Sequence, residues 1–114
     1  MEVSGEEYRV TFDPTSATIT CQGSLRLYGT TGYSSVVDLL NTAADQKSPT
    51  ITLNLEELKF LNSSGINAFS KFVIRVRNHK ASQLVIQGTS LFPWQSKSLK
   101  NLQRLMPELT LELM

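Results

Sequence analysis

The chain has 114 residues, 40% of them hydrophobic, and a formal net charge of +1. This length predicts one domain that buries its own core, over residues 1–114, with residues 1–7 as a loose polar extension. The balanced charge gives no general attraction for nucleic acid or for an anionic membrane. No apolar run is long enough to span a membrane, and no secretory leader is evident. The single cysteine excludes an internal disulfide and fits a cytoplasmic protein.

The first half of the chain predicts two strands, a loop and a helix. Apolar and polar residues alternate over residues 8–12 and 17–22, which is typical of two antiparallel strands. Cys21 shares the apolar face of the second strand, so we expect a buried thiol. The glycine-rich segment 23–32 predicts a loop, because its spacing fits no phosphate-binding motif. A helix follows, ends between residues 45 and 49, and carries on its inner face Tyr33, Val36, Val37, Leu40 and Ala44.

The central stretch, residues 54–65, links a predicted strand to a predicted helix. Ile51, Leu53 and Leu55 alternate with polar residues, as in a strand. Residues 64–78 place apolar side chains on one face at helical spacing. Between these elements Asn62-Ser63-Ser64-Gly65 supplies residue types that cap helices. Ser63 is therefore expected at or beside the amino terminus of the helix, where a negative charge on its hydroxyl would be stabilised.

This stretch resembles the central motif of the STAS family, which includes bacterial anti-sigma-factor antagonists and the cytoplasmic tails of sulfate transporters. In that motif a strand ending in a form like Asp-Leu-Ser leads to Asp-Ser-Ser-Gly at the start of a helix. Asn54 and Asn62 stand here in place of the two family aspartates, and Ser63 matches the serine that is phosphorylated in the antagonists. The likeness covers about residues 8–111.

The second half of the chain completes a mixed α/β fold. Leu84-Val85-Ile86 is a short apolar run, as in a strand covered on both faces. Pro93 can open a third helix and Pro107 can end it, and residues 109–113 alternate as a last edge strand. We predict a STAS-like sheet of four to five strands covered by about four helices. Loops at the carboxyl ends of parallel strands gather at one edge, so segments 23–32, 55–63 and 88–94 are expected together there.

The residues exclude the common kinds of catalytic and metal site. Ser63 would need a nearby base to act as a nucleophile, but His79, the one histidine, lies about 24 Å further along the same helix. Glu56 and Glu57 are interpreted as part of a solvated loop. No ligand spacing for a metal is present. We therefore predict a protein without enzymatic activity, cofactor or metal.

Two interpretations of the serine motif remain open. Asn62, Ser63 or Ser64 can serve only as helix caps, or Ser63 can also be a regulatory phosphoacceptor, with Ser64 as the second choice. Helical spacing places a stripe opposite the buried face, and this stripe is the predicted partner-binding surface: Asn62, Ser63, Asn67, Ser70 and Ile74. The family resemblance implies an anti-sigma factor or a switch-type serine kinase as partner, together with a serine phosphatase, in a partner-switching pathway.

Two other functions are kept as alternatives. The loop edge, with Gly29, Gly32, Thr89 and Ser90, could bind a nucleotide, another anion or a lipid. The domain could also be a scaffold that is never phosphorylated. The basic residues between 71 and 80 are interpreted as a solvated helix face rather than a nucleic-acid patch, and Trp94 as a core residue beside the loop edge.

Overall fold

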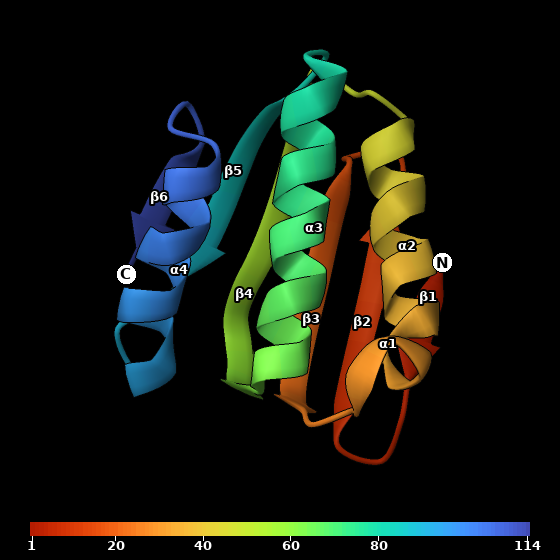
Figure 1. Ribbon diagram of the computed structural model, residues 1–114, viewed down its shortest axis with the longest axis vertical. Helices are drawn as coiled ribbons and strands as arrows, with labels where there is room; N and C mark the ends of the chain where they lie inside the picture. The colour runs from red at the N-terminus through yellow and green to blue at the C-terminus, as the bar shows by residue number, and fades with distance from the viewer.

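Six strands form one mixed sheet whose order in space follows their order in the chain. The computed structural model describes all residues 1–114 (Figure 1). The strands are β1 (Glu2–Ser4), β2 (Tyr8–Asp13), β3 (Thr18–Leu25), β4 (Thr50–Leu61), β5 (Gln83–Gly88) and β6 (Thr110–Leu113). The first three strands are antiparallel neighbours, whereas β3, β4, β5 and β6 run parallel to one another. The prediction of a mixed α/β sheet is confirmed, with six strands instead of four or five.

Helices cover one face of this sheet. The short α1 (Gly29–Gly32) leads into α2 (Ser34–Asp45), and together they cross over from β3 to the parallel β4. The other two crossovers between parallel strands are α3 (Ser63–His79) and α4 (Pro93–Leu105). The three long helices lie in one layer in front of the sheet, with α3 between α2 and α4 (Figure 1). Each crossover of this kind is right-handed in nearly all proteins, which places successive helices on the same side. None of the helices has the length and apolar character that a transmembrane segment requires.

The core lies between the helical layer and the sheet. Ile19, Cys21, Leu53 and Ile86 point from the strands into it and are fully buried. Burial raises the pKa of the Cys21 thiol to about 12, so this side chain behaves as a small apolar residue. The prediction that residues 84–86 are covered on both faces is wrong, because Val85 projects from the other face and is only half-buried.

The segment before β2 and the segment after β3 differ from the predictions. Residues 1–7 were expected to be loose, but β1 pairs with β2, and the amino group of Met1 donates a hydrogen bond to the carbonyl of Phe12. The predicted loop 23–32 begins later, because β3 continues to Leu25 and α1 follows. Gly23 sits in the strand with a φ of 85°, where a side chain would collide with the carbonyl oxygen of Glu7.

Strand β4 extends six residues beyond its predicted end. β3 continues beside it, and the register of this pair shifts twice, which local sequence patterns do not reveal. At the first shift the Oδ1 of Asn54 accepts a hydrogen bond from the backbone N–H of Glu56. Glu56 and Glu57 both lie in β4, which corrects their assignment to a loop, and Glu57 accepts a hydrogen bond from Gln22.

Candidate functional site

The start of α3 is tied to the segment after β3 by one side chain. Asn62 is the N-cap residue, and its Oδ1 accepts a hydrogen bond from the backbone N–H of Gly65 at 3.0 Å. Its Nδ2 donates to the carbonyl of Leu27 at 2.7 Å. An amide can make both bonds at once, whereas an ionised carboxylate can only accept. The asparagine therefore caps the helix and also fixes the position of the β3–α1 connection.

Tyr33 stabilises the same β3–α1 connection from the side of the core. The ring is buried in the core, and its hydroxyl donates a hydrogen bond to Asn62 Oδ1 at 2.7 Å. Burial raises the pKa of Tyr33 to about 12, so the hydroxyl keeps its proton as a donor. A Cβ on Gly65 would lie 2.7 Å from this hydroxyl and collide with Leu61. The glycine of the serine motif is thus required by close packing.

The two serines of the motif have different environments. Ser64 Oγ accepts a hydrogen bond from the backbone N–H of Gly29 at 3.2 Å, so it helps to hold the β3–α1 connection. Ser63 is the first residue of α3, its side chain is exposed, and its hydroxyl makes no hydrogen bond within the chain. The first turn of the helix contains no acidic residue. The predicted position of Ser63 at the helix amino terminus is confirmed.

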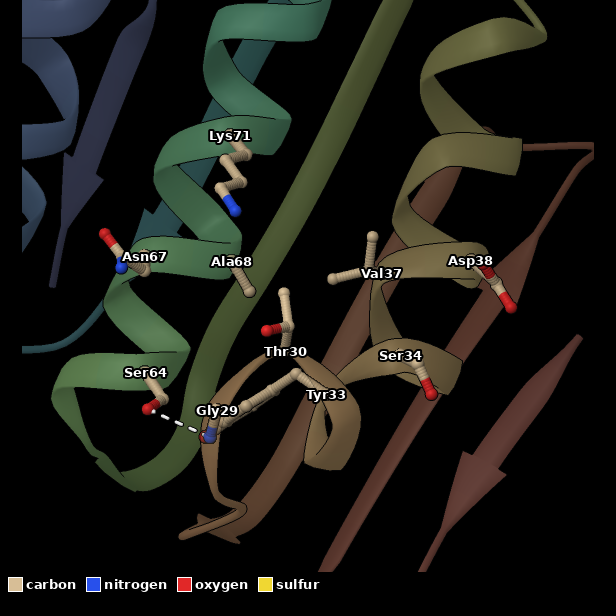
Figure 2. Close-up of a pocket in the computed structure, with 10 residues that line it drawn as sticks. All are labelled: Gly29, Thr30, Tyr33, Ser34, Val37, Asp38, Ser64, Asn67, Ala68 and Lys71. Atoms are coloured by element: carbon tan, nitrogen blue, oxygen red, sulfur yellow. Dashed lines mark hydrogen bonds between the residues drawn. The ribbon is translucent and has the colours of Figure 1, made fainter.

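A groove of about 420 Å³ lies between α3 and the α1–α2 segment, beside these serines. Its floor is apolar, with Val37 and Ala68, and Lys71 extends over it from α3 (Figure 2). Asp38 of α2 also lines the groove, and its side chain points away from Lys71 (Figure 2). Neither of these two charged side chains forms an ion pair. The full lining consists of Gly29, Thr30, Tyr33, Ser34, Val37, Asp38, Ser64, Asn67, Ala68 and Lys71.

The predicted partner-binding stripe is only partly exposed. Ser63 and Asn67 are exposed, but Ser70 and Ile74 are half-buried. The hydroxyl of Ser70 donates to the carbonyl of Ile66, so it satisfies its own helix rather than facing a partner freely. One exposed aromatic residue that the sequence did not single out stands nearby. Tyr28, between Leu27 and Gly29, is 86% exposed.

The structure does not assemble the predicted ligand edge. Gly29 lines the groove, while Gly32 does not. Thr89 and Ser90 lie beside the chain terminus, where the Ser90 hydroxyl donates to the carbonyl of Met114 at 3.0 Å. β5 pairs with β4 only as far as Asn54, so the loop after β5 lies well short of the end of β4 at Leu61. Segments 23–32 and 55–63 come together as expected, and segment 88–94 reaches the second of them at Leu58, whose carbonyl accepts a hydrogen bond from Trp94.

Beyond the end of its pairing with β5, strand β4 is hydrogen-bonded by two side chains of α4 instead. Gln95 is completely buried, and its Nε2 donates to the carbonyls of Leu55 and Leu58 while its Oε1 accepts from the N–H of Thr89. Trp94 is partly buried and donates to the carbonyl of Leu58. Gln95 was not predicted, although it stands four residues before Leu99 on the buried stripe of α4. A polar residue on an apolar stripe is the signal by which the sequence could have revealed it.

The far end of α3 carries a separate cluster of charges. Asp45 at the end of α2 accepts two hydrogen bonds from Arg75, at 2.8 and 2.7 Å, and His79 Nε2 lies 2.8 Å from the same carboxylate. These hydrogen bonds, that from Arg75 above all, hold the pKa of Asp45 well below its usual range. His79 therefore lies at the opposite end of α3 from Ser63. No group of three or more His, Cys, Asp and Glu side chains is placed to hold a metal ion.

The arrangement of strands and helices matches solved structures from Pseudomonas aeruginosa. A chain in the crystal structure of the diguanylate cyclase SiaD in complex with its activator SiaC aligns over 99% of this chain and 97% of its own length, with a TM-score of 0.74 and 13% identity. Apo-SiaC aligns over 100% and 97%, with a TM-score of 0.74 and 11% identity. The fold is similar to that of SiaC. No family model matches the sequence, and no curated protein does so either.

Proposed function

We propose that this chain is a non-enzymatic regulatory protein that binds a partner protein through the exposed start of α3. Ser63 is the phosphoacceptor, and its phosphorylation releases the partner, as in a STAS-like partner-switching module. The exposed Ser63 and Asn67 form the partner-binding surface together with the half-buried Asn62, Ser70 and Ile74, with Tyr28 beside them. The partner is an anti-sigma factor, a switch-type serine kinase or another signalling enzyme, and a serine phosphatase reverses the modification.

The observation that carries this proposal is the free hydroxyl of Ser63. Its neighbours Asn62 and Ser64 are both occupied by hydrogen bonds that shape the site. Ser63 alone is exposed and unbonded at the amino terminus of a 17-residue helix. There a phosphate would add about −1.5 to −2 charges near backbone N–H groups that stabilise it. The modification would therefore not disturb the fold, and its effect would fall on whatever contacts this surface.

Two further observations support a protein partner. Tyr28 is a large aromatic side chain held in solvent by a connection that Asn62 and Ser64 fix in place. Exposed, pre-positioned aromatic residues are frequent anchors of protein interfaces. In addition, SiaC, whose fold is similar, activates the diguanylate cyclase SiaD and has been crystallised in complex with it. An enzyme of that class is accordingly a candidate partner for this chain too.

The test is phosphorylation by a co-encoded serine kinase, followed by binding. Incubation with the kinase and ATP is expected to raise the intact mass by one phosphoryl group, mapped to Ser63. Ser63→Ala abolishes the shift, and the matched control Ser64→Ala keeps it. Ser63→Asp weakens partner binding by a factor of about 100, because an unpaired charge in a packed interface costs about 3 kcal/mol or more. Equal partner affinity for Ser63→Asp and Ser63→Ala would refute the switch, and an unmodified Ser63 would leave only a scaffold.

A further inference from the structure

The acidic residues are absent from a long segment of this nearly neutral chain. Between Glu57 and Glu108 the sequence contains no Asp or Glu. The same segment holds eight of the eleven cationic residues: Lys59, Lys71, Arg75, Arg77, Lys80, Lys97, Lys100 and Arg104. The net charge of +1 therefore conceals a strong separation of charge along the chain, which whole-chain composition does not show.

The fold turns this separation along the chain into a separation in space. Helices α3 and α4 lie side by side in the helical layer (Figure 1). Neither contains an acidic residue, and their cationic side chains are exposed. On the other side of α3, the helix α2 carries only acidic charges, Asp38 and Asp45. The helical layer is therefore basic over α3 and α4, and acidic over α2.

Most of the cations on this basic face lack an acidic partner. Arg75 is paired with Asp45 across the α2–α3 boundary. Arg77 donates to the carbonyl of Leu105, which joins α3 to α4 without neutralising its charge. No ion pair involves the other four of the six Lys and Arg residues in α3 and α4, which we call the free cations: Lys71, on the side of α3 that lines the groove toward α2, and Lys97, Lys100 and Arg104 on α4. A group of unpaired charges of one sign attracts a surface of the opposite sign and accelerates the encounter with it.

We infer that the α3–α4 basic face binds an acidic surface of the protein partner. This inference rests on the proposed function for the identity of its occupant. The 13 residues of α4 span about 20 Å, and two packed helices are about 10 Å apart. That footprint suits one side of a small protein–protein interface. A long polyanion such as duplex DNA would extend beyond it, over the acidic side of α2.

The same geometry gives the Ser63 phosphate an electrostatic route to the partner. Lys71 lies two turns along α3 from Ser63, about 12 Å by helical rise. This separation exceeds the Debye length of about 8 Å at physiological salt, so the phosphate changes the electrostatic potential over Lys71 only modestly under those conditions. At low salt the phosphate on Ser63 makes the electrostatic potential over Lys71 less positive, and this lowers the affinity for an acidic ligand by a few-fold. The effect of Ser63 modification on an acidic ligand should therefore shrink as salt is added.

The test uses a fluorescent poly-glutamate peptide as the acidic probe, with binding measured by anisotropy at low and physiological salt. We expect the triple variant Lys71→Gln, Lys97→Gln, Lys100→Gln to lose about tenfold in affinity, equivalent to ~1.4 kcal/mol. The matched control replaces the three cations outside the segment, with Arg9→Gln, Arg26→Gln and Lys47→Gln. It has the same net charge and should lose less than twofold. Circular dichroism checks that both variants are folded.

Each result has a definite meaning. Equal losses in the two triple variants would overturn the inference, because net charge alone would then explain binding. Tighter binding of duplex DNA or phosphatidylserine vesicles than of poly-glutamate, at equal salt, would overturn the choice of a protein partner. The choice of a protein partner would also be overturned if sedimentation showed that the chain associates with itself and that the triple variant Lys71→Gln, Lys97→Gln, Lys100→Gln does not. If the basic face is confirmed while Ser63 phosphorylation leaves partner binding unchanged, the proposed switch fails and the inferred surface stands.

Discussion

Replacing Asn62 by Asp tests whether the amide is required at the start of α3. The change keeps the shape and the acceptor for the N–H of Gly65 and the hydroxyl of Tyr33, but it removes the donor to the carbonyl of Leu27. The lost bond, with a carboxylate oxygen left facing a carbonyl oxygen, costs about 1–3 kcal/mol. A negative charge at the helix amino terminus stabilises the folded protein by about 0.3–1 kcal/mol, which offsets part of this loss. Asn62→Asp should therefore reduce the free energy of unfolding by about 1–2 kcal/mol at neutral pH.

Urea denaturation followed by the fluorescence of Trp94 measures this difference, and calorimetry should show a fall in Tm of about 5 °C. Asn101→Asp is the control, since Asn101 is exposed on α4 and its side chain makes no hydrogen bond. It should change stability by less than about 0.5 kcal/mol. If Asn62→Asp were as stable as the wild type, the bond to Leu27 would not be the reason for the amide. A gain in stability would mean that the favourable interaction of the new charge with the helix dipole is larger than the contribution of the lost hydrogen bond to Leu27.

The remaining predictions concern Gln95 and Asp45. Gln95→Met should cost about 2–4 kcal/mol in urea denaturation, because two buried β4 carbonyls and the N–H of Thr89 lose their partner; a change below about 1 kcal/mol would contradict this account. Asp45→Asn should cost at most about 1 kcal/mol at pH 7, since the pair with Arg75 is exposed. The pKa of Asp45 is lowered in the fold, so its contribution is present above about pH 4 and lost as the pH falls further. The two proteins should therefore converge in stability in acid, and a constant difference would count against this ion pair.

The periodic elements of this protein were predictable from the sequence. Helix α3 and its start at Ser63 followed from apolar residues at helical spacing after a cluster of capping residues. Pro93 and Pro107 bounded α4 in the same local way. The type of fold followed as well, because strands that alternate with helices can form few sheet topologies. The phosphoacceptor role of Ser63 stays a prediction.

The features that were missed depend on contacts between distant segments. β1 forms only because β2 offers it an edge, and β4 runs to Leu61 because β3 continues beside it. From the sequence, Asn62 was interpreted as a residue that lacks the negative charge of the family aspartate. In the structure its amide donates a hydrogen bond to the carbonyl of Leu27, which lies 35 residues away in the chain. Gln95 gave a detectable signal, but its acceptors on β4 could not be named without the fold.

The sequence by itself determined the strands and helices whose apolar residues are periodic, and that all acidic residues lie outside segment 58–107. Only the tertiary structure decided that α3 and α4 are neighbours, so that this segment becomes one basic surface with Ser63 at its end. Helix and strand formation depends on spacing within a few residues, which a sequence displays directly. The pairing of helices depends on how the sheet orders its strands, and that order is fixed by long-range packing and hydrogen bonding.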